Sequence, residues 1–204
     1  MRPKLLLATN NQDKVREYIS LLRNIPFELV TLAEQGINEE VDESGGSLEE
    51  NARLKATAFS SRSQLPALAD DSGLEVDALN GEPGFLSSRY AGENTTNAER
   101  ISYLLSRLKD VPREKRSARF RSVIVIATPE GAVEYCEGEC RGVITFSPKG
   151  GNGFGYDPIF YLPELGKTMA ELTGEQKNEI SHRGQAARKS LEVLEKLWQD
   201  KYAT

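Results

Sequence analysis

The sequence predicts an α/β fold built on a mixed sheet. Two observations support this class: short apolar runs alternate with amphipathic helical stripes in the first half of the chain, and two strand patterns separated by a turn follow in the second half. Alternating strands and helices favour parallel strands, whereas a hairpin requires antiparallel ones. Because no repeat, low-complexity tract or long linker divides the chain, we expect one domain over residues 1–204, with no internal boundary that can be assigned.

The first half of the chain alternates between strand and helix patterns. The apolar run 5–8 predicts a buried strand, and apolar residues at i, i+3, i+4 and i+7 then predict a helix along Val15, Tyr18, Ile19 and Leu22. A second helix is expected to begin at the capping-box pattern of residues 47–50, with an apolar stripe of Leu48, Ala52, Ala56 and Phe59 along one face. The apolar run 65–68 predicts a further buried strand that ends before Asp70, and alternation over 74–78 predicts a separate, half-exposed strand.

The second half of the chain adds a third helix, a hairpin and a last helix. The capping box at 96–99 predicts the third helix, and residues 118–128 form the clearest strand pattern in the chain. A turn then leads to a second strand over 132–145, so we expect a hairpin. Residues 150–158 contain too much glycine for a helix or a strand interior. The last helix is expected from near Ser181 to about Tyr202.

Composition and charge disfavour several classes of protein. With 38% hydrophobic and 28% charged residues, the chain has no apolar run near the roughly 18–20 residues of a membrane span. Its N-terminal apolar run is shorter than the about 7–15 residues of a signal peptide, so we expect a cytoplasmic protein that does not contact membranes. The net charge of −5 disfavours nucleic acid as a partner. The basic residues of 113–121 fit a solvated turn and strand edge, and a nucleic-acid-binding module built on them is the alternative.

The two cysteines, Cys136 and Cys140, lie four residues apart in a predicted strand. At about 3.3 Å per residue their Cα atoms would be ~13 Å apart, which exceeds the ~7 Å limit for a disulfide. Because the chain has one histidine, a zinc site of thiolates and imidazoles is also disfavoured. We expect both cysteines to be reduced and structural.

The adjacent carboxylates Asp70 and Asp71 are the strongest chemical signal in the sequence. Two acids at the end of a buried strand repel each other unless a cation or a shared proton relieves them. A hard divalent ion such as Mg²⁺ takes oxygen ligands, usually one or two carboxylates together with substrate phosphates. Asp42 and Glu43 could add ligands, although a turn and a solvated charge run are the structural alternatives for the two acidic segments. The acids therefore predict phosphate chemistry.

Three other motifs could bind parts of a nucleotide. The polar segment 9–14 joins a strand to a helix start, which suits phosphate, although it lacks the Walker pattern and could be a plain turn. The rings of Phe154 and Tyr156 could stack on a base or instead fill the core. His182 lies beside Arg183 at a predicted helix start, and donors there suit the carbonyl oxygen of a 6-oxopurine better than the amino group of adenine. A lone histidine is more often a packing residue.

In their order along the chain, these motifs resemble the inosine/xanthosine triphosphate pyrophosphatase family, whose members hydrolyse non-standard purine nucleoside triphosphates. The resemblance covers nearly the whole chain, through segments 8–14, 43–55, 69–74, 84–92, 153–158, 170–172 and 177–184. It implies an elongated mixed sheet with flanking helices, two lobes around a central cleft, and a homodimer. It also implies the reaction NTP + H₂O → NMP + pyrophosphate, with ITP, dITP and XTP as substrates and Mg²⁺ as the cofactor.

The resemblance further implies a role for each candidate site residue. Asp71 would accept the proton and, together with Glu43, bind the metal ion. The substrate-binding residues that it implies are Thr9, Asn10, Asn11, Gln12, Asp13, Lys14, Ser72, Phe154, Gly155, Tyr156, Asp157, Lys177, His182 and Arg183. Those at 154–157 and 182–183 would recognise the base, and the others would hold the triphosphate or the sugar. Lys55 and Asp70 are further candidates near the phosphates and the metal ion.

Two alternatives from other classes stay open at this point. One is a Maf-like pyrophosphatase that acts on other modified nucleotides, and the other is a nucleotide sensor without turnover. The segment 181–183 argues against the first alternative. A substrate panel separates the two enzymes, and an Asp71→Asn variant separates an enzyme from a sensor.

Overall fold

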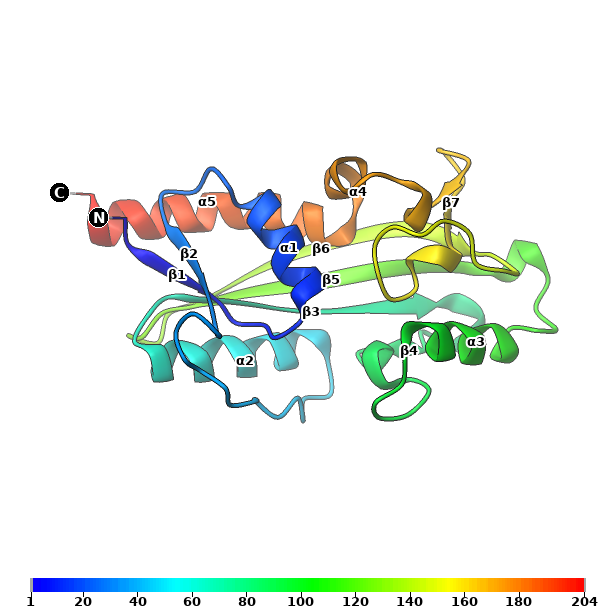
Figure 1. The fold of residues 1–204 in the computed structure, drawn as a ribbon, viewed down its shortest axis with the longest axis horizontal. Coiled ribbons are helices and arrows are strands. Elements are labelled where there is room, and N and C mark those ends of the chain that lie inside the picture. The colour runs from blue at the N-terminus through cyan, green and yellow to red at the C-terminus, as the bar shows by residue number, and fades with distance from the viewer. Residues whose placement is uncertain (1, 204) are drawn as a thin grey trace. The chain divides into compact units, whose positions relative to one another are not determined.

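The computed structural model describes residues 2–203 of the chain, and Figure 1 shows its strands and helices. The strands are β1 (Lys4–Leu7), β2 (Glu28–Thr31), β3 (Ala67–Val76), β4 (Pro83–Gly84), β5 (Ser117–Ala127), β6 (Val133–Ile144), β7 (Phe160–Leu162) and β8 (Lys167–Thr168). The helices are α1 (Gln12–Leu21), α2 (Leu48–Ser63), α3 (Asn97–Arg107), α4 (Gly174–Ile180) and α5 (His182–Tyr202). Within the described residues, no helix combines the length and the apolar character that crossing a membrane requires.

The strands form one mixed sheet in the order β2-β1-β3-β5-β6-β7-β8, with β4 paired to β3. β1 runs parallel to both β2 and β3, whereas the pairs β3–β4, β6–β7 and β7–β8 are antiparallel. The predicted α/β class with a mixed sheet is therefore confirmed. β5 and β6 are neighbours, and a tight turn in which Thr128 N–H donates to the Ala132 carbonyl joins them, as the hairpin pattern predicts.

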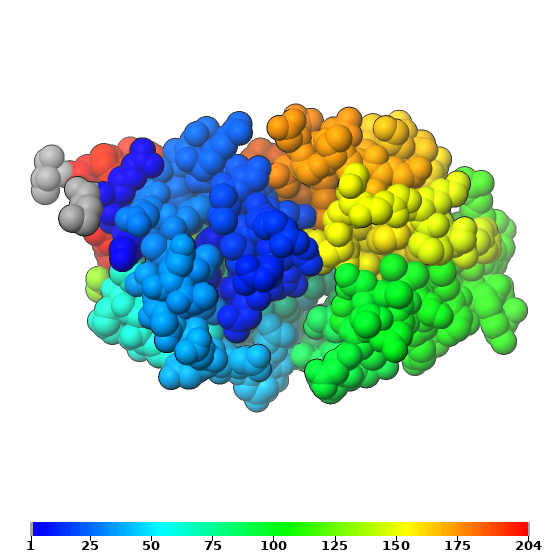
Figure 2. Space-filling view, viewed as in Figure 1, coloured from blue at the N-terminus to red at the C-terminus, as the bar shows by residue number. Residues whose placement is uncertain are grey.

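The chain divides into two compact units, and β3, β5 and β6 contribute residues to both. Unit 1 comprises Met1–Asp71, Ser122–Gly138 and Arg183–Thr204, and unit 2 comprises Ser72–Arg121 and Glu139–His182. In unit 1, α1 and α5 cover one face of the sheet and α2 covers the other (Figure 1). The blue atoms of the N-terminal segment form much of the visible face of unit 1 in Figure 2, so the start of α1 lies at the surface.

Unit 1 is held together by an apolar core on the face of the sheet that α1 and α5 cover. Its buried members include Leu5, Leu7, Tyr18, Leu68, Ile124, Ala187 and Leu194. Successive strand residues point to opposite faces, so Leu6 is directed to the α2 side. There α2 buries Ala52, Ala56 and Phe59, the stripe that its sequence predicts. The sheet of unit 1 is thus apolar on both faces.

Unit 2 has a separate apolar core on one face of its strands. The core includes Leu74, Val76, Leu104, Phe120, Tyr156 and Phe160. The other face carries ion pairs between strands: Arg119 Nε lies 2.6 Å from Glu75 Oε2, and Arg121 lies 3.3 Å from Glu75 Oε1. Arg116 is buried and donates to the carbonyl oxygens of Leu108, Val111 and Thr145. These three arginines of the basic stretch therefore all have partners within unit 2.

The strand that carries the acidic pair differs from the sequence prediction. Residues 67–76 form one ten-residue strand, β3, rather than two strands separated by a polar turn. Asp70 and Asp71 therefore lie inside a strand and not beyond its end. Gly73 allows β3 and β4 to approach closely, because a Cβ atom at this position would collide with the carbonyl oxygen of Gly84. Gly73 is thus required by strand packing.

The helices largely follow their local signals. α3 has the complete predicted capping box between Thr96 and Glu99. At α2, Ser47 accepts from Glu50 N–H as predicted, but the Glu50 carboxylate accepts from Gly46 N–H instead of completing the box. α5 begins at residue 182 and ends at residue 202, in agreement with the prediction. Both cysteines are free and buried, so the prediction that they do not form a disulfide is also confirmed.

Candidate active site

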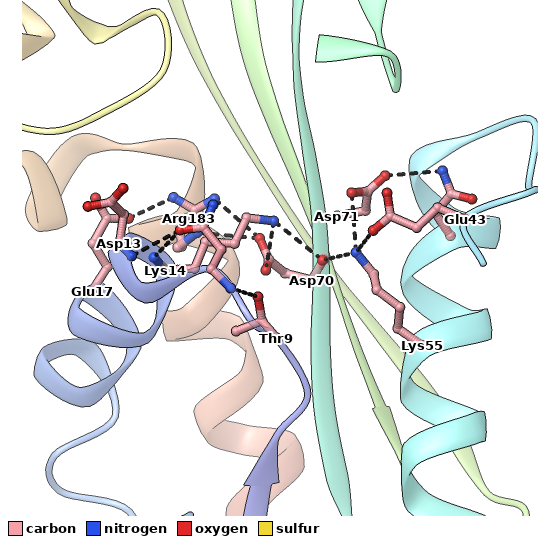
Figure 3. Close-up of polar contacts among 11 residues, drawn as sticks. Thr9, Asp13, Lys14, Glu17, Glu43, Lys55, Asp70, Asp71 and Arg183 are labelled. Atoms are coloured by element: carbon pink, nitrogen blue, oxygen red, sulfur yellow. Dashed lines mark hydrogen bonds and ion pairs between the residues drawn. The ribbon is translucent and has the colours of Figure 1, made fainter. Parts of the chain in front are cut away.

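Asp70 and Asp71 are consecutive residues of β3, so their carboxylates point to opposite faces of the sheet (Figure 3). Asp70 faces the side chain of Lys14 on α1 and that of Arg183 on α5. Asp71 faces Lys55 on α2. The two acids are therefore separated by the strand, and each lies beside its own cationic side chain.

Lys55 lies between the two carboxylates that were predicted to bind a metal ion. Its Nζ is 2.6 Å from Glu43 Oε1 and 3.4 Å from Asp71 Oδ1, and it donates to the Asp70 carbonyl oxygen at 2.8 Å. The Lys55 side chain is 12% exposed and that of Asp71 is 9% exposed. Two carboxylates share one ammonium group here, so Lys55 balances only one of their two negative charges.

Asn51 connects the loop before α2 to Asp71, the candidate proton acceptor. Its Nδ2 donates to Asp71 Oδ2 at 3.4 Å, and its Oδ1 accepts from Gly45 N–H at 2.9 Å. Because the side chain is fully buried, both contacts are shielded from water. Asn51 therefore orients the Asp71 carboxylate and places the segment that contains Glu43.

Charge and burial shift the pKa values of these groups. Burial raises the pKa of Asp71, and although Lys55 and Lys14 lower it, the carboxylates of Glu43 and Asp70 raise it further, so it lies above its ordinary value. For Lys55, burial lowers the pKa, but the surrounding carboxylates outweigh burial and raise it above its ordinary value. Asp71 therefore has a higher proton affinity than an exposed aspartate.

The segment 9–14 forms the predicted turn from β1 into α1. Asn11 caps the helix, because its Oδ1 accepts from Asp13 N–H at 2.9 Å and from Lys14 N–H at 3.2 Å. Thr9 Oγ1 in turn accepts from Asn11 N–H. Asn10 and Gln12 are exposed. The turn thus presents the positive end of the α1 dipole at the surface of unit 1.

Asp70 forms the other half of the polar cluster in unit 1. Its Oδ1 lies 3.0 Å from Lys14 Nζ, and its Oδ2 accepts from Arg183 Nη2 at 3.2 Å. The Asp70 side chain is 0% exposed. Burial alone raises the pKa of Asp70, but Lys14 and Arg183 outweigh burial and hold the pKa well below its ordinary value.

We expect an Asp70→Asn variant to be less stable than the wild type at neutral pH. The difference in their free energies of unfolding should become smaller in acid. A carboxyl group whose pKa is lowered by folding contributes stability above its unfolded-state pKa of about 3.9. That contribution is lost as the pH falls from about 4 through the folded-state pKa, so the advantage of the wild type shrinks there. Urea unfolding of both proteins between pH 7 and about 2.5 measures the difference. A difference in unfolding free energy that stays constant or grows in acid would contradict the lowered pKa of Asp70.

Unit 2 gathers a second set of predicted site residues. Asp157 Oδ2 accepts from Lys177 Nζ at 2.5 Å and from Phe154 N–H at 2.9 Å. The Lys177 ammonium lies 4.7 Å from the centroid of the Phe154 ring, within the range of a cation–π contact. Asp157 and Lys177 are buried, whereas Phe154 is half-buried. A Cβ atom on Gly153 would collide with the Asp157 carboxylate, so this loop requires glycine there.

The remaining predicted residues of unit 2 have structural contacts of their own. The His182 ring is buried and stacks on Phe120, with centroids 4.8 Å apart and planes 16° apart. Tyr156 is buried in the apolar core, and its hydroxyl donates to the Ser87 carbonyl oxygen at 2.9 Å. Ser72 follows Asp71 in β3 and is half-buried. Tyr156 therefore fills the core, one of the two roles that its sequence allowed.

The structure places the predicted residues in three groups, each within one unit. In unit 1, Lys14 and Arg183 contact Asp70 on one face of the sheet, and Glu43 and Asp71 contact Lys55 on the other. Unit 2 brings together Phe154, Asp157 and Lys177. Sequence reasoning assigned no role to Asn51 or Glu17. A signal for Asn51 existed, because it is a polar residue three positions after Leu48 on the apolar stripe of α2. Glu17 had no such signal, because its partner Arg183 lies 166 residues away.

Comparisons with known proteins agree with the fold. The model of the Ham1 family matches residues 5–193. A relative named dITP/XTP pyrophosphatase from Desulforamulus reducens is 49% identical over 195 residues, which cover 96% of this chain and 97% of the relative. A relative of the same name from Geobacillus kaustophilus is 46% identical over 197 residues, 97% of this chain and 95% of the relative. The structure of a HAM1 protein from Coxiella burnetii superimposes with a TM-score of 0.87 at 43% identity and covers 95% of this chain and 99% of that one.

Proposed function

This chain belongs to the Ham1 family, and from that premise we propose that it hydrolyses the non-standard purine nucleoside triphosphates ITP, dITP and XTP to the monophosphate and pyrophosphate. This reaction would remove them from the nucleotide pool. The observation that carries the proposal is 49% and 46% identity, over nearly the full length of both chains, to relatives named dITP/XTP pyrophosphatase. A Maf-like enzyme has no comparable support, because the matching family model is that of Ham1.

The triphosphate is proposed to bind at the start of α1. Anions bind well at a helix N-terminus, where N–H groups and the helix dipole favour negative charge. Lys14, in the first turn of α1, adds a full positive charge, and its side chain is 11% exposed. Thr9, Asn10 and Asn11 add neutral polar groups in the same turn. This segment therefore combines the groups that a polyanion needs.

Mg²⁺ is proposed to bind Glu43 and Asp71. The donor set fits a hard cation, because both ligands are carboxylates and both already converge on the Lys55 ammonium group. Within the described residues no three acidic, histidine or cysteine side chains form a metal site by themselves, so substrate phosphates would supply further ligands. Bound Mg²⁺ supplies charge neutralisation at the phosphates and lowers the pKa of water.

Asp71 is proposed to accept the proton of the attacking water at a carboxylate oxygen. As the water oxygen bonds to the α-phosphorus, the bond to the leaving pyrophosphate breaks and the proton passes to Asp71. A carboxylate oxygen of Asp71 can serve as this general base. Asn51 holds the carboxylate in position through Oδ2. General base catalysis of this kind typically contributes about 10²–10⁴-fold to a rate.

The base is proposed to bind the residues of unit 2. Phe154 is half-buried and offers an aromatic ring for stacking, and its backbone N–H is held by Asp157. A donor at His182 would favour a carbonyl oxygen at purine position 6. An adenine amino group would leave such a donor unpaired, at a cost of about 1–3 kcal/mol for each buried group.

A homodimer and a cytoplasmic location are also proposed, on the family resemblance alone. Light scattering coupled to size-exclusion chromatography measures the mass in solution. A mass of twice 22.6 kDa is expected, and a stable monomer at micromolar concentration would contradict the dimer.

Pyrophosphate release from a panel of triphosphates tests the proposed function. With Mg²⁺ present, we expect dITP, ITP and XTP to be hydrolysed at least about tenfold more efficiently than ATP, as one unpaired buried donor implies. Chelation by EDTA is expected to abolish release, and added Mg²⁺ to restore it. Equal kcat/KM values for ATP and dITP would contradict the specificity, and release that EDTA leaves unchanged would contradict the metal requirement.

A further inference from the structure

Four charged side chains in unit 1 form a continuous series of ion pairs, Glu17–Arg183–Asp70–Lys14 (Figure 3). Arg183 Nη1 donates to Glu17 Oε2 at 2.6 Å, and its Nη2 and Nε donate to Asp70 Oδ2 at 3.2 and 3.4 Å. Asp70 Oδ1 then lies 3.0 Å from Lys14 Nζ. We call this series the ion-pair chain.

The guanidinium group of Arg183 uses all three of its nitrogens in the ion-pair chain. Its side chain is 1% exposed, and each of its three nitrogens donates to a carboxylate. The Tyr18 ring centroid lies 5.9 Å from the guanidinium carbon, so an aromatic ring further restricts the group. The family resemblance implied that Arg183 recognises the base, whereas these side-chain contacts are made to Asp70 and Glu17. A guanidinium that is buried between two carboxylates acts on those carboxylates.

The ion-pair chain ends at Lys14, whose ammonium group lies at the candidate phosphate-binding turn. A lysine side chain has many accessible rotamers, so a fixed ammonium group must be held by its surroundings. Asp70 holds Lys14 through Oδ1 and also through its carbonyl oxygen, 3.5 Å from Nζ. Arg183 in turn fixes the Asp70 carboxylate through Oδ2, which leaves Oδ1 directed to Lys14. Glu17 fixes Arg183 from the other side.

We propose that Arg183 and Glu17 are positioning residues for the phosphate side of the site, which act through Asp70 on Lys14. The proposal rests on the proposed function and deepens it. A preorganised ammonium group binds a polyanion more tightly because less freedom is lost on binding. Loss of Arg183 should therefore weaken binding of every triphosphate by a similar factor. Loss of a base-recognising residue would instead change the preference between dITP and dATP.

The experiment uses Arg183→Lys and Glu17→Gln in the full chain, with two assays. Lysine keeps the charge but loses the fork of donors that contacts Asp70 and Glu17 together. The first assay measures KM and kcat for dITP and dATP. The second measures the inhibition constant of inorganic tripolyphosphate, a competitor that has phosphates and no base. Arg16→Lys is the matched control, because Arg16 lies on α1 and its side chain is 71% exposed.

We expect Arg183→Lys to raise the KM for dITP and the inhibition constant of tripolyphosphate together, each by about tenfold. Glu17→Gln should change both in the same direction by a smaller factor. The ratio of kcat/KM between dITP and dATP should stay at the wild-type value, and Arg16→Lys should change none of these quantities. In a Lys14→Met background, Arg183→Lys should have little further effect, because Arg183 acts through Lys14.

Three results would overturn the proposal. One is an altered dITP to dATP ratio with unchanged tripolyphosphate inhibition, which would make Arg183 a base-recognising residue. Another is full additivity of Arg183→Lys and Lys14→Met, and the third is a loss of thermal stability with unchanged KM and inhibition constants. If Arg183→Lys does not fold, Glu17→Gln decides the same question. If the wild type releases no pyrophosphate from any triphosphate, the proposed function fails, and calorimetric binding of tripolyphosphate to wild type and variants then tests the positioning role by itself.

Discussion

An Asp71→Asn variant is expected to lose roughly 10²–10⁴-fold in kcat for dITP, the range that a general base typically contributes. Asparagine has nearly the same shape and can keep the contact with Asn51, but it cannot accept the proton of the attacking water. It also removes one of two carboxylates that are proposed to bind Mg²⁺. Steady-state release of pyrophosphate in saturating Mg²⁺ measures the loss, and calorimetry is expected to show that dITP still binds.

Glu43→Gln provides the comparison for the Asp71 variant. Glu43→Gln removes the other proposed carboxylate ligand and leaves the proton acceptor Asp71 in place. Added Mg²⁺ should therefore restore more activity to Glu43→Gln than to Asp71→Asn. Residual turnover of Asp71→Asn within tenfold of the wild type would show that another group accepts the proton. Unchanged circular dichroism in both variants establishes that a loss of activity is not a loss of fold.

A Lys177→Met variant is expected to lose about 3–5 kcal/mol of unfolding free energy, the usual cost of removing one partner from a buried ion pair. Lys177 Nζ lies 2.5 Å from Asp157 Oδ2, and the two side chains are 5% and 3% exposed. Methionine leaves the Asp157 carboxylate buried without its cation. Urea unfolding at pH 7 measures the loss, and a shift of less than 1 kcal/mol would show that the site relaxes and admits water.

Lys109→Met is the matched control for Lys177→Met. Lys109 is 75% exposed and lies 3.9 Å from Asp110 Oδ2, so the same substitution there removes a surface pair. Lys109→Met should change the free energy of unfolding by no more than about 0.5 kcal/mol. A double variant of Lys177→Met with Asp157→Asn should be more stable than the single variant, because no unpaired charge is then buried. A double variant as unstable as the sum of both single variants would contradict this account.

The features that the sequence predicted well depend on short-range contacts. The capping box of α3 involves residues three apart, and the apolar stripe of α2 repeats within one helix. The mixed sheet followed from the alternation of elements and from the hairpin of β5 and β6. α4 was missed although Thr173 and Gln176 form a capping box before it, a local signal of the same kind. The short strands β7 and β8 offered no comparable pattern.

The features that the sequence could not predict depend on distant partners. Residues 70–73 have a composition typical of a turn, but pairing within the sheet makes them the middle of β3. The contacts of Arg183 with Asp70 and Glu17 join residues 113 and 166 positions apart, so no local pattern in the sequence could predict them. A cation near Asp70 and Asp71 was predicted from their adjacency in the sequence, whereas the placement of their side chains on opposite faces of the sheet became visible only with the strand.

The consecutive placement of the two acids on β3 also protects the alignment of the sheet. A slip of this strand by a single residue would exchange its faces, so Asp71 would turn toward Lys14 and Asp70 toward α2. Leu68 and Ala69 would change sides as well, but both are apolar and the sheet of unit 1 buries apolar residues on either face. Hydrophobic patterning alone therefore discriminates weakly against such a misfolded pairing. The charged groups on the two faces differ in number and geometry, so they favour the native register of β3 over the shifted one.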